Sequence, residues 1–178
     1  MRYGNHHEQV IALFSEHFKD VPFTGIEIGT AQGMLTKSLL LRLPNLTSLY
    51  TIDPYRHDPS SHFEASFPVE AQEQRKGEAD VALAIYADRL VRLIVGSDEA
   101  ATQTPDEVDF VYIDGDHTPA QIRRDISNYY PKVKAGGIFG GHDYQHAIPI
   151  FRTMIDGQIC LGDDLTWWVI KDERELHV

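Results

Sequence analysis

The sequence predicts an α/β domain with a mostly parallel β-sheet and helices on both faces. Short apolar runs alternate along the chain with longer segments whose apolar residues recur at helical spacing, the pattern of successive βα units. Several apolar runs end in glycine, aspartate or histidine, at the edge where such sheets bind ligands. The last run follows a connection too short for a helical crossover, so we expect that strand to enter antiparallel.

The first part of the chain supplies two helices and two strands. Residues 8–18 carry apolar side chains at helical spacing and predict an amphipathic helix. Residues 25–28 predict a buried strand, and residues 34–43 predict a helix with leucines along one side. Residues 46–52 predict a second strand, which ends at Asp53.

A polar and aromatic segment at residues 55–78 interrupts this alternation. Because it follows the end of a strand, where ligands bind, one interpretation is a lid over a substrate. A surface loop with a short helix explains the same composition. The next helix is predicted at residues 79–90. Its inward side chains are expected to be Val81, Ala84, Ile85 and Leu90.

The second part continues the pattern. Its strands are predicted at residues 91–95, 109–113, 138–141 and 165–170, with a brief one near 159–161. Thr118 has the character of an N-cap and Pro119 that of a first helical residue. The helix that they open is expected to run past Val133 to the glycines that follow, and a short helix is predicted at residues 148–155.

The composition limits the function. The 178 residues suffice for one domain, residues 1–178, with a single core. The net charge of −11 argues against a nucleic acid or an anionic membrane surface as the main partner, because both need basic patches. Cys160 is the only cysteine, so no internal disulfide can form. The N-terminus has no apolar run typical of a signal peptide, and we expect a cytoplasmic protein.

The turn after the first strand reads T-G-I-E-I-G-T-A-Q-G over residues 24–33. Glycines let the backbone approach a ligand closely, and the helix that follows aims its N-terminus at that ligand. A dinucleotide fingerprint would need a small residue where this chain has Met34, whereas a G-x-G-x-G loop fits positions 29, 31 and 33. With the acid Glu27 ahead of it, the loop resembles the first motif of class I S-adenosylmethionine (SAM) methyltransferases. An ordinary tight turn would show the same glycines.

Asp53 closes the second predicted strand. A carboxylate at this place can accept hydrogen bonds from both hydroxyls of a ribose, which NAD and SAM both contain. An aspartate that opens an Asp-Pro turn is the plainer interpretation of the same position. Asp53 therefore indicates an adenosine-containing ligand without distinguishing between the two.

The second half carries the more specific pattern. It reads V-D-F-V-Y-I-D-G-D-H-T at residues 108–118 and Y-P-K-V-K-A-G-G-I-F-G-G-H-D-Y at residues 130–144. Over residues 25–144 the chain resembles methyltransferase family 24. It is similar to the macrocin-type sugar O-methyltransferases and, more distantly, to the catechol-type cation-dependent O-methyltransferases. The resemblance implies a Rossmann-like, seven-stranded class I methyltransferase sheet that uses SAM as its cofactor.

The resemblance also implies how SAM is held. The implied cofactor-binding residues are Glu27, Gly29, Thr30, Ala31, Gly33, Asp53, Ser97, Asp98 and Asp114. In the family the acid and the loop at residues 29–33 hold the methionine part. Asp53 would then hold the ribose, and Ser97 with Asp98 would border the adenine.

A divalent metal is the next implication. The macrocin-type relatives bind one through the aspartate that opens D-G-D and an acidic pair that ends the next strand. Carried over, these positions are Asp114, His142 and Asp143. Two carboxylates suit Mg²⁺, whereas His142 in place of an acid favours Mn²⁺ or another softer ion. The alternative is that Asp114 contacts the cofactor while His142 and Asp143 form only local hydrogen bonds.

His117 and His142 are the candidate catalytic residues. In the catechol-type relatives the position three after the first metal aspartate holds the lysine that takes the hydroxyl proton, and this chain has His117 there. An imidazole, with an ordinary pKa of about 6.5, suits proton abstraction at neutral pH. Packing against the start of the next helix is the alternative role of His117.

These observations predict a SAM-dependent O-methyltransferase that acts on a small hydroxylated molecule such as a sugar or a phenol. A NAD-binding Rossmann oxidoreductase is an alternative that Met34 disfavours. A non-catalytic SAM-fold binding protein is another, and the acids and histidines at the strand ends disfavour it. A chain of this length has no substrate-capping domain, so we also expect a homo-oligomer in which a second copy helps to complete the site.

Overall fold

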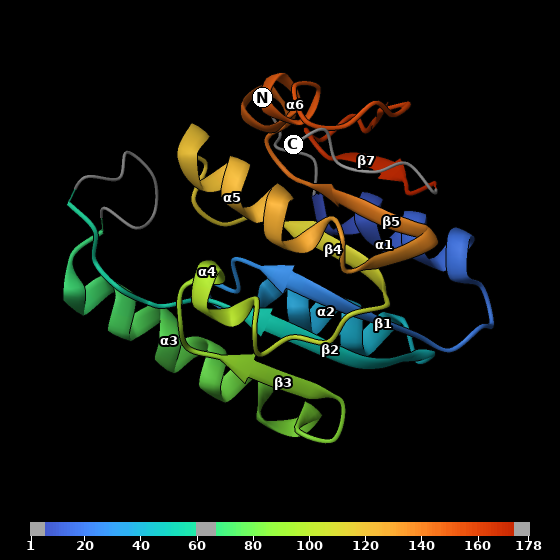
Figure 1. The fold of residues 1–178 in the computed structure, drawn as a ribbon. Helices are drawn as coiled ribbons and strands as arrows, with labels where there is room; N and C mark the ends of the chain where they lie inside the picture. The colour runs from blue at the N-terminus through green and yellow to red at the C-terminus, as the bar shows by residue number, and fades with distance from the viewer. Residues whose placement is uncertain (1–5, 60–66, 173–178) are drawn as a thin grey trace.

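The structure is a computed structural model that describes residues 6–59 and 67–172. Its centre is a seven-stranded sheet in the order β3-β2-β1-β4-β5-β7-β6, with helices around it (Figure 1). The strands are β1 Phe23–Ile28, β2 Leu46–Ile52, β3 Leu90–Leu93, β4 Val108–Ile113, β5 Val133–Gly141, β6 Cys160–Leu161 and β7 Trp167–Ile170. This arrangement confirms the predicted α/β fold.

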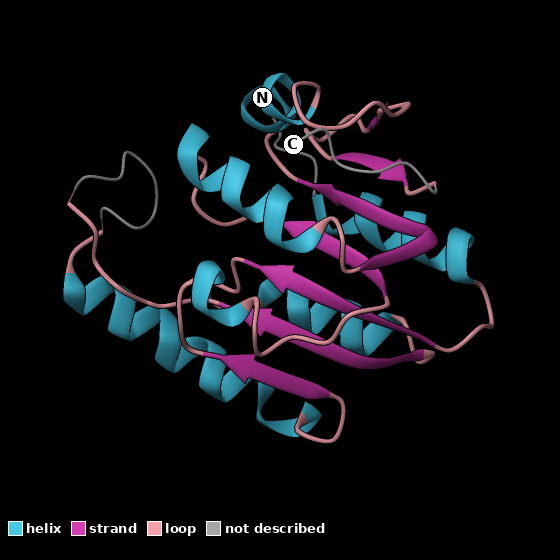
Figure 2. Ribbon diagram, viewed as in Figure 1, coloured by secondary structure: helices cyan, strands magenta, loops and turns pink. Residues whose placement is uncertain are grey.

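The first five strands are parallel and the last one is not. Parallel pairing joins β1 to β2 and β4, β2 to β3, and β4 to β5. β7 runs antiparallel to β5 and to β6, as Figure 2 shows. The antiparallel last strand was expected from the short connection before it. All five parallel strands therefore present their carboxyl ends at one edge of the sheet.

The helices pack on the two faces of the sheet. They are α1 His6–Phe18, α2 Met34–Arg42, α3 Val69–Leu83, α4 Ser97–Ala100, α5 Pro119–Tyr129 and α6 Tyr144–Phe151. Side chains of α1, α2 and α3 form one core cluster, and those of α5 and α6 form the other. No helix in the described part of the chain is long and apolar enough to cross a membrane.

The helix before β3 differs from the prediction. It occupies Val69–Leu83 and continues as a short 3-10 helix, Ala84–Tyr86, so it begins well before the expected residue 79. Val81 and Ile85, expected inside, are 81% and 78% exposed, and the buried positions are Gln72, Arg75, Ala79 and Leu83. The inward stripe begins with polar residues, which concealed the helical period. Of the predicted lid at residues 55–78, residues 60–66 lie outside the described part.

Two further boundaries need correction. α5 ends at Tyr129, and Val133 belongs to β5 rather than to the helix. Pro131 explains this end, because a proline has no backbone N–H with which to continue the helical hydrogen bonds. α6 begins at Tyr144, four residues before the predicted start, and contains Pro149 in its interior. A proline favours the first turn of a helix, whereas Pro149 lies in the second turn of α6.

Candidate functional site

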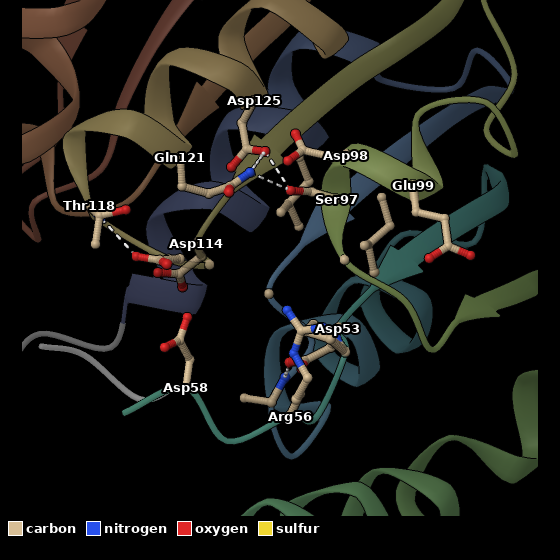
Figure 3. A pocket seen from close by; sticks show the side chains of 18 of the residues that line it. Asp53, Arg56, Asp58, Ser97, Asp98, Glu99, Asp114, Thr118, Gln121 and Asp125 are labelled. Carbon is tan, nitrogen blue, oxygen red and sulfur yellow. Dashed lines mark hydrogen bonds between the residues drawn. The ribbon is translucent and has the colours of Figure 1, made fainter. Parts of the chain in front are cut away.

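A cavity of about 520 Å³ opens at the carboxyl edge of the parallel strands (Figure 3). Its walls come from the segments that follow β1, β2, β3 and β4, together with the polar side of α5 and the beginning of α3. This is the size of pocket that encloses a ligand as large as a nucleoside cofactor. Six of the predicted site residues line it: Gly29, Ala31, Asp53, Ser97, Asp98 and Asp114.

The loop after β1 has a backbone that needs glycine. Gly29 has φ +99°, and a Cβ there would lie 2.1 Å from the carbonyl oxygen of Asp114. Gly33 also has a positive φ, +78°, at the start of α2. Ala31 sits between them at φ +46°, a left-handed conformation that disfavours a side chain. The loop therefore keeps its glycine-like geometry although its middle position is alanine.

Asp53 is fixed by backbone donors on both sides. Its Oδ2 accepts a hydrogen bond from the Ala31 N–H and its Oδ1 accepts one from the Tyr55 N–H, both at 2.8 Å. The Tyr55 hydroxyl in turn donates to the Ala31 carbonyl oxygen at 2.7 Å. These bonds join the end of β2 to the loop after β1. The carboxylate consequently has a set orientation at the cavity wall.

Glu27 lies below the cavity rather than in its wall. Its side chain is buried, and its Oε2 accepts a hydrogen bond from the Thr36 hydroxyl at 2.5 Å. Burial raises the pKa of Glu27 to about 8, and the nearby charges of Asp114 and Asp53 act in the same direction. Thr30 is buried as well, and neither residue is among the lining residues in the described part of the chain.

The end of the cavity near β3 is held by a polar network on α5. The Ser97 hydroxyl donates to Asp125 Oδ1 at 2.6 Å, and Gln121 Nε2 donates both to Ser97 Oγ and to Asp125 Oδ1 at 2.9 Å. Burial raises the pKa of Asp125 to about 7. Asp98 accepts a hydrogen bond from Arg124 Nε at 2.9 Å. Figure 3 shows Ser97, Asp98, Gln121 and Asp125 gathered at this end of the cavity.

Sequence reasoning missed this contribution of α5. Gln121, Arg124 and Asp125 all line the cavity. A signal was present, because the polar residues at positions 121, 124, 125 and 128 recur at helical spacing beside the buried apolar residues of the same helix. Only the apolar half of that pattern was used to predict the helix.

Acids and histidines meet at the ends of β4 and β5. Asp114, His117 and Asp143 each offer a ligand atom, and these atoms lie within 4.8 Å of one another. His117 Nε2 is 3.7 Å from Asp114 Oδ1 and 3.4 Å from Asp143 Oδ2. His142 Nδ1 is 3.3 Å from Asp143 Oδ1 and 3.9 Å from Asp114 Oδ1. The structure thus brings together the four residues predicted for the metal and for the base.

The two imidazoles differ in their surroundings. His142 Nε2 lies 2.7 Å from the carbonyl oxygen of Asp164 and so donates its hydrogen there. Burial alone would lower the pKa of His142, but the hydrogen bond with Asp143 and the charge of Asp114 raise it to about 8. For His117, burial lowers the pKa below its ordinary value, although Asp143 opposes this shift. Their surroundings therefore shift the pKa values of the two imidazoles in opposite directions.

A third histidine, His146, lies near this group. It is exposed on α6, and its ring centroid is 6.0 Å from that of His117. It is absent from the close set formed by Asp114, His117 and Asp143. No motif marked it, because its proximity results from the turn at Asp143 that opens α6.

The model of a family described as a methyltransferase domain matches residues 26–144 of the chain, about two thirds of its length. A curated relative, an uncharacterized protein of Acanthamoeba polyphaga mimivirus, is 26% identical over 144 residues. The match covers 78% of this chain and 59% of that protein, so the chain spans about three fifths of the length of the relative.

Solved structures share the fold. The calicheamicin methyltransferase CalS11 is similar with a TM-score of 0.70 and 13% identity, over 96% of this chain and 80% of that one. The O-methyltransferase NovP is similar with a TM-score of 0.66 and 16% identity, over 93% and 80% of the two chains. At such identities the likeness concerns the fold of the sheet and its helices, and function has to be argued from the site.

Proposed function

The chain belongs to the family of methyltransferase domains that its residues 26–144 match, and on that premise we propose that it transfers a methyl group from SAM to a hydroxyl group of a small molecule. The observation that carries this proposal is the cavity at the carboxyl edge of the sheet. It joins a glycine-containing loop, the carboxylate that closes β2 and the serine that follows β3. An adenosine-containing methyl donor needs these three elements on one wall.

The lining residues fit SAM in chemistry as well as in size. Asp53 is oriented by two backbone N–H groups and faces the cavity, which suits the two hydroxyls of a ribose. Ser97 and Asp98 at the other end suit an adenine ring. Gly29 and Asp114, which approach each other closely, would then border the methionine part. In this orientation the sulfonium methyl would be directed toward the acids and histidines at the ends of β4 and β5.

We further propose that His117 takes the proton of the acceptor hydroxyl. A general base has to be unprotonated at the working pH, and burial lowers the pKa of His117. Asp143 and Asp114, at 3.4 and 3.7 Å from its Nε2, would stabilise the imidazolium that forms. His142 is the weaker candidate because its raised pKa, about 8, keeps it protonated. SAM, when bound, supplies the electrophilic methyl group, and the chain aligns the two reactants.

The same residues fit a divalent cation. Asp114 and Asp143 offer carboxylate oxygens. The bond of its Nε2–H to Asp164 orients the His142 ring, so that Nδ1 would bind a cation once its proton is released. When bound, a cation would lower the pKa of an acceptor hydroxyl. His117 Nε2 lies close to the same carboxylates, so either imidazole could be the metal ligand while the other is the base. Measuring metal binding to variants of each histidine distinguishes the two assignments. A nitrogen ligand favours Mn²⁺ or Fe²⁺ over Mg²⁺.

A screen for methyl acceptors tests the proposed activity. The protein is incubated with SAM and with pools of sugars, phenols and other hydroxylated molecules, and mass spectrometry detects products heavier by one methylene unit. Methylated hydroxyl products, formed by the wild-type chain and absent with Asp53→Ala, would support the proposal. Methylation restricted to nitrogen or carbon would contradict the hydroxyl acceptor while leaving SAM dependence intact.

A further inference from the structure

The segment that follows β2 turns alternate side chains in opposite directions. The Tyr55 hydroxyl is bound to the Ala31 carbonyl oxygen, and His57 Nδ1 lies 2.8 Å from the carbonyl oxygen of Phe67. Arg56 and Asp58, the residues between and after them, line the cavity instead. Figure 3 shows both side chains rising from this segment into the cavity. Two side chains of opposite charge thus face the same space, held there by anchors at the intervening positions.

The arginine side chains that line the cavity differ in how they are held. Three arginines line it in the described part of the chain: Arg56, Arg75 and Arg124. Arg124 is engaged with Asp98 at the β3 end, where the adenine is placed. Arg75 is 9% exposed, and its guanidinium lies over the Phe67 ring, 5.2 Å from the centroid, so it is held in the wall. Arg56 is exposed and its side chain reaches into the cavity.

We propose that Arg56 and Asp58 bind the amino-acid part of SAM, Arg56 its carboxylate and Asp58 its ammonium group. This inference rests on the proposed function, since it assigns contacts within that same cofactor site. SAM carries a carboxylate and an ammonium on one carbon atom, and the remaining lining charges are mostly acids that would repel the carboxylate. An arginine guanidinium matches a carboxylate with two parallel hydrogen bonds.

The spacing of the pair suits such a ligand. Arg56 and Asp58 are separated by one residue, so their Cα atoms lie at most roughly 7 Å apart, and both side chains line the same cavity. The long arginine side chain can close that distance, so one substituted carbon can reach both charges. Asp58 points toward Asp114 in Figure 3, at the side of the cavity where the methionine part is placed. A role for this pair would explain why Tyr55 and His57, the neighbours of Arg56, are both held by hydrogen bonds to backbone carbonyl groups.

Two product-like ligands separate this proposal from the proposed function. S-adenosylhomocysteine contains the amino-acid part, and 5′-methylthioadenosine lacks it while keeping the adenosine and the thioether. Isothermal titration measures the Kd of each for the wild type, for Arg56→Met and for Asp58→Asn. We expect either substitution to weaken S-adenosylhomocysteine binding by about tenfold or more and to leave 5′-methylthioadenosine binding within about twofold. Arg152→Met, which removes an exposed arginine of the α6 end, is the matched control and should change neither Kd.

A third ligand separates the two contacts. The decarboxylated analogue of S-adenosylhomocysteine keeps the amine, so Asp58→Asn should weaken its binding and Arg56→Met should not. Equal losses for all ligands, or no loss for any, would overturn the assignment of Arg56 and Asp58 while leaving the adenosine site in place. If the wild type bound neither S-adenosylhomocysteine nor 5′-methylthioadenosine, the proposed function would fail, and this inference with it.

Discussion

The site has two ends that are built in different ways. The ends of β1, β2 and β3 border the cavity, whereas of the four acids and histidines at the ends of β4 and β5 only Asp114 lines it. At the ends of β1, β2 and β3, polar groups are tied to the protein by short hydrogen bonds, such as those of Asp53 at 2.8 Å and of Ser97 at 2.6 Å. At the ends of β4 and β5, the carboxylates and imidazoles approach one another at 3.3 to 3.9 Å. The first end is arranged to hold a ligand in one orientation. The members of the second are close enough together to share a proton or a cation.

From this difference we expect the β1–β3 end to determine the affinity for the cofactor and the β4–β5 end to determine the rate of methyl transfer. Substitutions at the β1–β3 end should weaken cofactor binding with a smaller effect on the methyl-transfer step. Substitutions at the β4–β5 end should slow that step while the cofactor still binds. Substitutions at each end can therefore separate the two roles.

His117→Ala should give the largest loss. Removing a general base costs about 10²-fold or more in rate, and the rate should be measured at saturating SAM with an acceptor from the screen. The Kd for S-adenosylhomocysteine should stay within about twofold, because binding rests on the other end. His146→Ala, which removes an exposed imidazole beside the same ring, is the control and should keep the rate. A His117→Ala protein with full rate and an unchanged acidic limb of its pH profile would place the base elsewhere.

Asp53→Ala should show the converse pattern. It removes two charge-assisted hydrogen bonds to the ribose, each contributing roughly 1.5–3 kcal/mol at most, so the Kd for S-adenosylhomocysteine should rise by about tenfold or more. The loop at Ala31 would also lose its bond to Oδ2. Isothermal titration measures the Kd, and kinetics at saturating SAM measure what rate remains. An unchanged Kd would refute the ribose assignment.

Metal binding separates the two imidazoles. Titration with Mn²⁺ should give a Kd for the wild type that rises by about tenfold or more in His142→Ala and in Asp143→Asn. His117→Ala should retain most of the affinity if His117 is the base. The reverse order for the two histidine variants would exchange their roles. Full turnover of the wild type in excess EDTA would mean that the reaction needs no cation.

Glu27→Gln should give the smallest change, in the pH dependence of stability. The folded pKa of Glu27, about 8, is above the unfolded value of 4.5, so the folded state retains a proton that the unfolded state has released between these values. The free energy of unfolding therefore falls as the pH rises through this window, by up to about 1.4 kcal/mol per pH unit for this one group. Glutamine stays neutral, and the slope should flatten.

Urea unfolding at about pH 5 and about pH 8 measures that slope. Relative to the wild type, Glu27→Gln should be more stable at the higher pH than at the lower one. Asp125→Asn should act in the same direction over a narrower window, because burial raises the pKa of Asp125 from 3.8 to about 7. Parallel stability curves for wild type and Glu27→Gln would show that the buried carboxyl titrates normally.

The sequence predicted the residues at the ends of β1 and β2 better than those that α3 and α5 contribute to the cavity. Gly29 and Asp53 follow strands whose apolar runs are continuous, so their place at the sheet edge could be read from the pattern. The polar spacing on its helix marked Asp125, but its place in the site could not be read from the sequence, because it depends on the packing of α5 against α4. The inward face of α3 was misread for a related reason. Gln72 and Arg75 are buried but polar, and hydrophobic periodicity gives no sign of them.

At the β4–β5 end, the sequence predicted which residues would meet but not how each of them is oriented. The motif indicated Asp114, His117, His142 and Asp143, and all four meet in the structure. The difference between the two histidines came only from the fold. The carbonyl of Asp164 that holds His142 lies far along the chain, and its position depends on the antiparallel entry of β7.

Titration of the wild-type chain with S-adenosylhomocysteine and, in parallel, with NAD⁺ shows whether this cavity is a SAM site. The two ligands share the adenosine that Asp53 and Ser97 would hold, and they differ in the rest. If the cavity is a SAM site, we expect saturable binding of S-adenosylhomocysteine at one site per chain and no saturable binding of NAD⁺. Saturable binding of NAD⁺ without binding of S-adenosylhomocysteine would contradict that assignment.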